Sequence, residues 1–224
     1  MSAPDETPAV PGPWVKICGL STAADVAVAI EHGAAALGFV LTDSPRRISP
    51  QRAAELVAAV PESVASVAVV RHEDVDTAID RARAAGVGWI QLHGQRTAAE
   101  VRQVRTAGFQ VIRAVRMDDP PQMFEDWGEQ LLLIDAAVPG SGAAWDYSLV
   151  REAAAGRRWL VAGGLDPRNV AAALAASGAA GADVSSGVES SRGIKDPQLI
   201  ARFLHAAHGR HEAGAPAADS PSGA

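Results

Sequence analysis

The chain has 224 residues, a formal net charge of −6 and 48% hydrophobic residues, which suits a single globular domain. The acidic balance argues against a general nucleic-acid or anionic-membrane binder, and one cysteine excludes an intrachain disulfide. The sequence has no apolar run of about 18 residues that could span a membrane, and its Pro-rich, acidic start is unlike a signal peptide. We therefore predict a cytoplasmic protein.

Short apolar runs alternate with helical runs along the whole chain. The pattern predicts eight strands, at 14–18, 35–41, 63–70, 88–92, 109–115, 131–134, 159–162 and 182–185. Between and after them it predicts helices over about 21–32, 51–60, 75–85, 97–107, 146–155, 167–176 and 196–208, with a weaker helix that begins at Pro120-Pro121.

Eight strand–helix units of about 25 residues each favour a parallel (β/α)₈ TIM barrel over residues 13–208. An open, doubly wound sheet is the alternative fold. The first strand is not followed by G-x-G-x-x-G, which lowers the case for a dinucleotide-binding fold. Residues 1–12 and 209–224 are expected to be a disordered leader and a disordered tail.

Glycines close the predicted strands seven and eight. The first of these strands ends in Gly163-Gly164, and the second ends in Ser185-Ser186-Gly187. Glycine lets the backbone approach a ligand closely, and backbone N–H groups at a helix start favour an anion. In TIM barrels the loops after these two strands often bind a phosphate group. The sequence therefore predicts a phosphorylated substrate.

Functional groups of a barrel gather where its strands end, so polar residues at those positions are candidates. They are Lys16, Cys18, Asp43, Arg46, Arg47, Arg71, His72, Gln91, His93, Arg113, Arg116, Asp135 and Asp183. The two-residue period places Lys16 and Cys18 on one face, toward the barrel mouth, with Ile17 toward the helices. Gln91 and His93 share a face in the same way.

The lone Cys18 has two interpretations, a small buried hydrophobe or a reactive thiol. A nearby cation such as Lys16 can lower a thiol's pKa, which favours a base or nucleophile here. Asp135, directly after an apolar run, either caps a loop or serves as an acid or base across the mouth. Arg46 is either a solvated side chain or a bidentate carboxylate ligand.

The remaining histidines give weaker signals. His93 is open between a satisfied core histidine and a substrate contact. His205, His208 and His211 could suggest a metal by spacing, but no cysteine or carboxylate cluster accompanies them. We predict that these three are solvated and that the protein binds no metal.

Several segments together resemble the phosphoribosylanthranilate isomerase family of tryptophan biosynthesis. They run from the first strand to the last helix and read KICGL, GFVLTDSPRRISP, QLHG, LLLIDAAVPGSGAAWDY, AGGLDPRNV and DVSSGVESSRGIKD. The resemblance implies an Amadori rearrangement of N-(5-phosphoribosyl)anthranilate to the 1-deoxyribulose phosphate, with Cys18 as the base and Asp135 as the acid. It also implies that Lys16 favours the thiolate and that Arg46 holds the anthranilate carboxylate.

The resemblance places the phosphate on Gly163, Gly164, Ser186 and Gly187, and we expect His93 and Asp183 to contact the substrate as well. It implies no cofactor, because proton transfers within one substrate suffice. We expect no nucleic-acid or membrane partner, and either a monomer or a homodimer.

The chain departs from the family pattern at three places. PGSG replaces GGTG after the aspartate, WDY replaces FDW, and strand three ends in VAVVR in place of VFVN. Three rival functions stay open. They are an imidazole-pathway isomerase for a bisphosphorylated substrate, an indole-forming synthase, and a non-catalytic barrel that binds a sugar phosphate.

Overall fold

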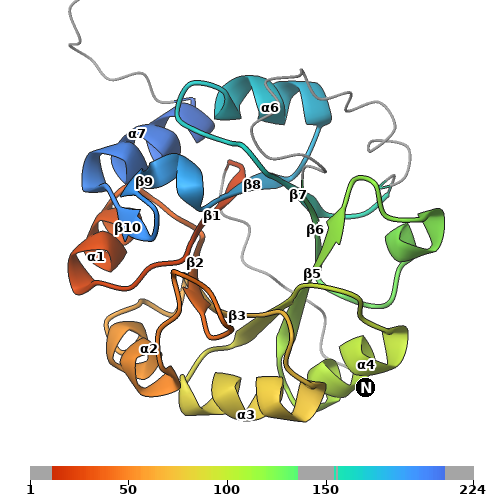
Figure 1. Cartoon of the computed structure of the whole chain (residues 1–224). Helices are drawn as coiled ribbons and strands as arrows, with labels where there is room; N and C mark the ends of the chain where they lie inside the picture. Colours follow the sequence, from red (N-terminus) through yellow and green to blue (C-terminus); the bar gives the residue numbers. More distant parts are fainter. Residues whose placement is uncertain (1–11, 136–153, 155, 210–224) are drawn as a thin grey trace, which may run out of the picture.

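Eight apolar strands pair in chain order and close into a parallel barrel, viewed down its axis in Figure 1. This structure is a computed structural model that describes residues 12–135, 154 and 156–209. The strands are β1 (Trp14–Cys18), β2 (Ala36–Val40), β3 (Ala65–Val70), β4 (Trp89–Leu92), β5 (Gln110–Arg116), β6 (Leu131–Asp135), β7 (Trp159–Ala162) and β8 (Gly181–Val184). Because β1 also pairs with β8, the barrel prediction is confirmed and the open sheet is wrong.

The helices surround the ring of strands on its outer side (Figure 1). They are α1 (Ala23–Glu31), α2 (Pro50–Val57), α3 (Val75–Ala84), α4 (Ala98–Thr106), α6 (Val170–Ser177) and α7 (Pro197–Ala207). A polar side chain caps the start of every one of these helices except α6: for example, Thr22 accepts the N–H of Asp25, and Thr97 forms a capping box with Glu100. Of the helices described here, none has the length and hydropathy needed to cross a membrane.

The two-residue period of the strands sorts their side chains into an inner and an outer layer. Ile17, Phe39 and Ile90 pack outward into the core shared with the helices. A second cluster, which includes Trp14 and Leu160, fills the barrel. A third, smaller cluster of Cys18, Val40 and Val69 lies near one end of the barrel, where polar residues also line the cavity.

Two predicted helices differ from the structure. The segment after Pro120 forms only a short 3₁₀ turn, η1 (Pro121–Phe124), since two prolines lack N–H donors and Arg113 takes the carbonyl oxygens of Met123 and Glu125. Helix α6 begins at Val170, three residues later than predicted. The preceding turn closes on itself, because the N–H of Asp166 donates to Asn169 Oδ1.

A small hairpin follows β8 and was not predicted. After a 3₁₀ turn, η2 (Ser186–Val188), strands β9 (Glu189–Ser191) and β10 (Ile194–Lys195) pair antiparallel. The hairpin lies beside α1 and α7 in Figure 1.

Some predictions fall on residues that the structure does not describe. The expected helix over 146–155 is one of them, apart from Ala154, which is buried. The expected disordered leader and tail also lie outside the described residues, except for Gly12 and Gly209.

Candidate active site

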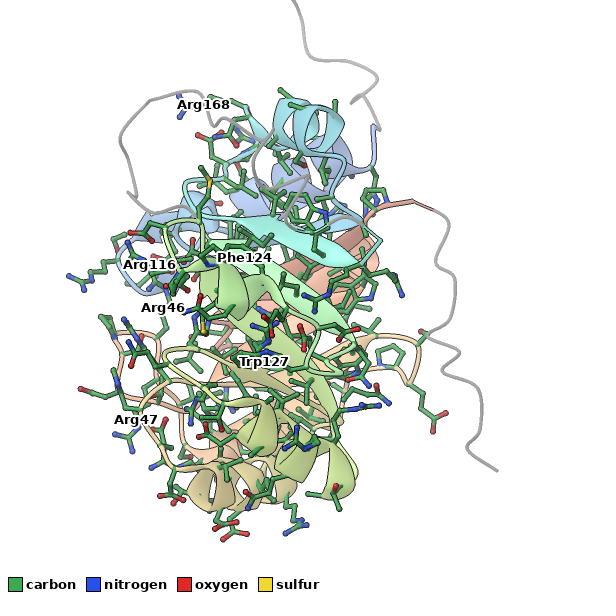
Figure 2. All side chains as sticks on the ribbon, turned by 90° about the vertical axis from the view of Figure 1, so that its right-hand side faces the viewer. Arg46, Arg47, Arg116, Phe124, Trp127 and Arg168 are labelled. Carbon is green, nitrogen blue, oxygen red and sulfur yellow. The ribbon has the colours of Figure 1, made fainter. Side chains whose placement is uncertain are left out.

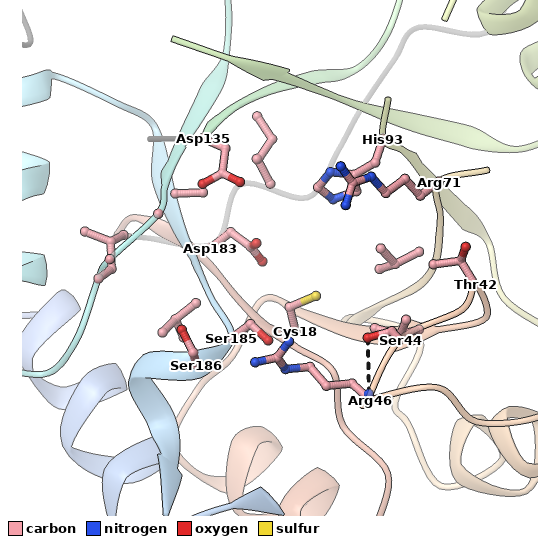
Figure 3. A pocket seen from close by; sticks show the side chains of 18 of the residues that line it. Cys18, Thr42, Ser44, Arg46, Arg71, His93, Asp135, Asp183, Ser185 and Ser186 are labelled. Atoms are coloured by element: carbon pink, nitrogen blue, oxygen red, sulfur yellow. Dashed lines mark hydrogen bonds between the residues drawn. The ribbon is translucent and has the colours of Figure 1, made fainter. Parts of the chain in front are cut away.

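A cavity of about 320 Å³ opens where the strands end, and Figure 3 shows the side chains around it. Its volume suits a small metabolite. Most of the predicted site residues line it, from strands all round the ring: Cys18, Arg46, His93, Asp135, Gly163, Gly164, Asp183 and Ser186. Two predicted residues, Lys16 and Gly187, do not.

Lys16 lies beneath the cavity, inside the barrel. Its side chain is fully buried, and Nζ donates to Asp183 Oδ1 at 2.7 Å across the β1–β8 pair. Burial lowers the pKa of Lys16, but Asp183 and, to a smaller extent, Cys18 outweigh that effect and raise it above the usual value. Lys16 is therefore a protonated ammonium that reaches the cavity only through its neighbours.

The Cys18 thiol ends β1 and points into the cavity (Figure 3). Burial raises its pKa above the usual value, and the positive charges of Lys16 and Lys195 oppose that effect only in part. The negative charge of Asp183 raises it further. The expected lowering of this pKa is therefore wrong, and the group is a protonated thiol near neutral pH.

Asp135 ends β6 and lines the same cavity as Cys18. In Figure 3 both side chains project into the space between them. An apolar strand, Leu131–Asp135, holds the carboxyl group at the cavity wall, where it is half-buried. An acid and a thiol thus face one small volume, as the strand-end argument predicted.

The glycine turns after β7 and β8 form the wall on another side. Gly163 and Gly164 have φ of 88° and 65°, left-handed values that favour glycine. Within the described residues, the backbone N–H groups of Gly164 and Ser186 donate no hydrogen bond, so they are available to an anion. Gly187 has another role: a Cβ there would lie 1.8 Å from the carbonyl oxygen of Leu165, so this glycine allows close packing.

Arg46 lies along the cavity wall below Cys18 in Figure 3, with its backbone N–H bonded to Ser44. Its guanidinium makes a bidentate ion pair with Glu189, at 2.6 Å from Nε and 2.9 Å from Nη2. Arg46 is therefore not a freely solvated side chain, because it already pairs with a carboxylate of the protein, and its role toward a substrate carboxylate stays a prediction.

His93 stands on the opposite side of the cavity, beside Arg71 in Figure 3. Its Nε2 lies 2.5 Å from Gln91 Nε2, which confirms that these two side chains share a face. Burial, together with the positive charges of Lys16, Arg71 and Arg96, lowers the pKa of His93 to about 3. The imidazole is therefore neutral at physiological pH. His93, Arg71 and Asp135 also border a second cavity of about 840 Å³.

Two strand-five arginines have different positions. Arg113 points outward and donates to Glu129 and to loop carbonyls, with its guanidinium 4.0 Å from the Trp127 ring centre. It is therefore a structural residue and does not line the mouth. Arg116 borders the second cavity and pairs with Asp118. Figure 2 shows Arg116, Arg46, Arg47 and Arg168 toward one end of the barrel.

His205 and His208 make contacts within the protein in place of the full solvation that was predicted for them. His205 Nε2 lies 3.0 Å from His32 Nδ1, and His208 bonds to the carbonyl oxygen of Gly33. Both contacts join α7 to the end of α1. His211 lies outside the described residues. Among the residues that are described, no three His, Cys, Asp or Glu side chains are grouped to hold a metal ion.

Sequence reasoning missed three residues of this region: Glu189, Lys195 and Ser185. Lys195 is buried and donates to Glu189 Oε1 and to the Ser185 carbonyl oxygen, both at 2.8 Å. The available signal was Gly193 between two short polar segments, since a glycine in a short connection is typical of a hairpin.

Comparison with known proteins decides the family. A sequence model of N-(5′-phosphoribosyl)anthranilate (PRA) isomerase matches residues 15–206. The chain belongs to this family. A curated isomerase of this name from Paracoccus denitrificans is 43% identical over 204 residues, which cover 85% of this chain and 94% of that protein. One from Caulobacter sp. (strain K31) is 42% identical over 205 residues and covers 85% and 96%.

Solved structures agree with this assignment. A TrpF structure from Jonesia denitrificans has a TM-score of 0.80 and 36% identity, and covers 89% of this chain and 98% of that one. A phosphoribosyl anthranilate isomerase in complex with reduced 1-(o-carboxyphenylamino)-1-deoxyribulose 5-phosphate has a TM-score of 0.76 and 32% identity, with 87% and 98% covered.

Proposed function

We propose that this cavity converts N-(5′-phosphoribosyl)anthranilate to 1-(2-carboxyphenylamino)-1-deoxyribulose 5-phosphate, a step of tryptophan biosynthesis, with Cys18 and Asp135 in the catalytic roles. One observation carries the assignment. A thiol and a carboxyl group from β1 and β6 line one cavity, together with Gly163 and Gly164 after β7 and Ser186 after β8. A barrel that only bound a sugar phosphate would need neither group, which disfavours the binding-only alternative.

In the first step Asp135 acts as the general acid. It gives a proton to the furanose ring oxygen while the bond between that oxygen and C1 breaks. The lone pair of the anthranilate nitrogen moves into a C1–N double bond, so the opened sugar is a protonated Schiff base. Asp135, at a strand end rather than on a loop, is held rigidly enough for this transfer.

In the second step Cys18 acts as the base. Its thiolate takes the proton from ribose C2, the electron pair forms a C1–C2 double bond, and the nitrogen loses its positive charge. The resulting enolamine becomes the ketone by tautomerisation. The positive charge of the opened substrate next to Sγ adds to those of Lys16 and Lys195, which lower the pKa of Cys18, so the thiol releases its proton to solvent and reacts as the thiolate. The base is thus activated by the intermediate on which it acts.

The remaining residues bind the substrate. The backbone amides of Gly163, Gly164 and Ser186 take the phosphate. The left-handed φ values of Gly163 and Gly164 support this role, as do the N–H groups of Gly164 and Ser186, which donate no hydrogen bond within the described residues. Arg46 takes the anthranilate carboxylate. The neutral His93 and the carboxylate of Asp183 contact the sugar from opposite walls. These proton transfers use no metal and no organic cofactor.

The test is turnover of N-(5′-phosphoribosyl)anthranilate, followed by the loss of its fluorescence, together with growth of a tryptophan auxotroph that lacks this isomerase. Turnover and rescue are expected. The bisphosphorylated substrate of the related imidazole-pathway isomerase is assayed in parallel. Turnover of that substrate alone would overturn the proposal in favour of the rival enzyme. Binding of substrate without turnover would favour the non-catalytic barrel.

Assembly and location belong to the same proposal. One solved structure is described as generated monomers of a dimeric isomerase from Thermotoga maritima, and the dimeric parent enzyme supports the homodimer in the prediction of a monomer or homodimer. The net charge of −6 and the single cysteine support a cytoplasmic enzyme without a nucleic-acid partner.

A further inference from the structure

Glu189 is a buried carboxylate beside the cavity to which the mechanism assigns no role. Only 4% of its side chain is exposed. Oε1 accepts hydrogen bonds from Arg46 Nε at 2.6 Å and from Lys195 Nζ at 2.8 Å. Oε2 accepts from Arg46 Nη2 at 2.9 Å and from the Gly193 N–H at 3.1 Å. Four donors thus fix the carboxylate in position and orientation.

The electrostatics agree with a permanent charge on this residue. Burial would raise the pKa of Glu189, but hydrogen bonds from Arg46, Lys195 and the Gly193 amide lower it to about 2. Lys195 is also tied to the loop after β8, because it donates to the Ser185 carbonyl oxygen. The β9–β10 hairpin therefore connects Arg46, on the loop after β2, to the loop after β8.

The manner in which Glu189 holds Arg46 determines what Arg46 can still do. A guanidinium has five N–H donors and two edges that can each take a carboxylate. Glu189 occupies the edge formed by Nε and Nη2. The outer edge, formed by Nη1 and Nη2, is left for a second carboxylate. Arg46 lines the cavity, so a ligand can reach its side chain there.

The side chain of Arg46 has little freedom elsewhere. It passes so close to Gly19 that a Cβ there would lie 2.7 Å from Arg46 Cδ. Its backbone N–H is fixed by Ser44 Oγ at 3.2 Å. Backbone, stem and one guanidinium edge are thus set before any ligand arrives. A side chain fixed in advance loses less entropy when it binds.

Building on the proposed function, we propose that Glu189 is a positioning residue: it holds the inner edge of the Arg46 guanidinium so that the outer edge is presented to the carboxylate of the substrate. Glu189 touches no substrate in this scheme and acts through Arg46. Lys195 fixes Glu189 in turn. The anthranilate carboxylate then becomes the second of two carboxylates on one arginine.

The test compares Glu189→Gln with Glu189→Ala in the full chain. Gln keeps the size of the side chain and an acceptor for Lys195, but its NH₂ group faces an Arg46 donor, so the bidentate pair is lost. We expect KM for N-(5′-phosphoribosyl)anthranilate to rise about three- to tenfold, the effect of freeing one long side chain, with a smaller change in kcat. An unchanged KM in both variants would overturn the proposal.

A double-mutant cycle with Arg46→Ala shows whether Glu189 acts through Arg46. We expect the KM of Arg46→Ala with Glu189→Ala to equal that of Arg46→Ala alone, because the positioning residue has nothing left to position. Effects that multiply would contradict this mechanism. Glu129→Gln is the matched control, because Glu129 is also a buried carboxylate paired with two arginines, yet neither of them lines the cavity.

A binding measurement separates this proposal from the function on which it depends. The probes are the reduced product analogue and its counterpart without the ring carboxylate, titrated into each folded variant by calorimetry. Glu189→Gln should weaken the carboxylate-bearing probe and leave the other unchanged; equal weakening of both would indicate a merely structural role. If wild type binds both probes but turns over no substrate, the proposed function fails while the positioning role stands.

Discussion

Two buried glutamates of this barrel are built alike and sit in different surroundings. Glu189 and Glu129 each bind two cations, with 4% and 0% of the side chain exposed. Arg46, the arginine on Glu189, lines the cavity, while Arg113, on Glu129, lines neither cavity. A buried glutamate paired with an arginine therefore presents that arginine to a ligand in one place and stabilises the fold in the other. The role depends on whether the guanidinium of the arginine faces the cavity.

The Glu129 cluster shows what the second role requires. Arg113 donates to the carbonyl oxygens of Met123 and Glu125 and to Glu129, and its guanidinium stacks on Trp127. Its donors go to the chain between β5 and β6, so the loop is held against the barrel. Arg113 is buried, so a ligand cannot reach its guanidinium, in contrast to the outer edge of Arg46.

The largest effect is expected on kcat, from substitution of the two proposed catalytic residues in the cavity. Cys18→Ala and Asp135→Ala should each lower kcat by roughly 10²- to 10⁴-fold, the usual contribution of a positioned acid or base, with a much smaller change in KM. Both side chains end strands whose other residues carry the packing, so the melting temperature should change little. Steady-state fluorescence assays and thermal unfolding measure the two quantities.

Arg46→Ala provides the contrast within the same cavity. Its KM should rise strongly while kcat changes less, because a carboxylate ligand binds the substrate without moving a proton. Near-normal turnover in both the Cys18 and Asp135 variants would remove the acid and base assignment. An unchanged KM in Arg46→Ala would remove this residue as the carboxylate ligand.

The second largest effect is expected on protein stability, from substitution of Glu129. Glu129→Ala leaves Arg113 buried without its carboxylate, which should lower the free energy of unfolding by about 3–5 kcal/mol. Urea denaturation measures this loss. At temperatures where the variant is folded, kcat and KM should match those of wild type. A variant of normal stability with a raised KM would mean that the two clusters do not differ as described.

Sequence reasoning was accurate where local patterns decide the outcome. Short apolar runs, and the glycines that end several of the helices, predicted all eight strands to within about two residues. The strand-end rule then placed Cys18, Asp135 and His93 on one cavity. The pleat also explains Arg113: its neighbours Ile112 and Ala114 point into the barrel, so Arg113 points out, and the same period could have predicted this.

What the sequence missed depends on partners far along the chain. Glu189 meets Arg46 across 143 residues, and Lys16 meets Asp183 across 167. No periodicity encodes such pairs, because they follow from closure of the ring. The pKa of Cys18 was wrong in direction for the same reason: Lys16 is nearby, but burial and Asp183 outweigh it.

The third effect is expected on the pKa of Cys18, from changes to the ion pair between Lys16 and Asp183. Asp183→Asn removes a negative charge that raises the pKa of Cys18 and leaves Lys16 unneutralised beside the thiol. The pKa of Cys18 should therefore fall, and alkylation by iodoacetamide near neutral pH should become several-fold faster. Cys18 is the only cysteine, so mass spectrometry reports this site alone.

Lys16→Met is the opposing variant for that experiment. It removes the largest of the effects that lower the Cys18 pKa, so the pH midpoint of alkylation should move up. Midpoints that shift together in the two variants would contradict the charge balance described here. The direction in each case tests whether the ion pair of Lys16 and Asp183 controls the pKa of Cys18.

The smallest effect is expected at Glu73, a carboxylate that lies outside both cavities and pairs with Arg81 at 2.5 Å. Burial raises its pKa, but the N–H groups of Glu73 and Arg71, Thr42 and Arg81 lower it from 4.5 to about 2. A group with a lowered folded-state pKa stabilises the protein above its unfolded pKa and loses that contribution as the pH falls toward the folded value.

Glu73→Gln should therefore lower the free energy of unfolding by about 1–2 kcal/mol at neutral pH, a value reduced for solvent screening. The difference from wild type should shrink between pH 4.5 and pH 2, the window set by the two pKa values of Glu73. Urea denaturation across that range measures it. KM should stay unchanged, as for Glu129, because Arg81 donates to the Leu41 carbonyl oxygen and not to a ligand. A constant difference at every pH would mean that the ion pair contributes nothing through its charge.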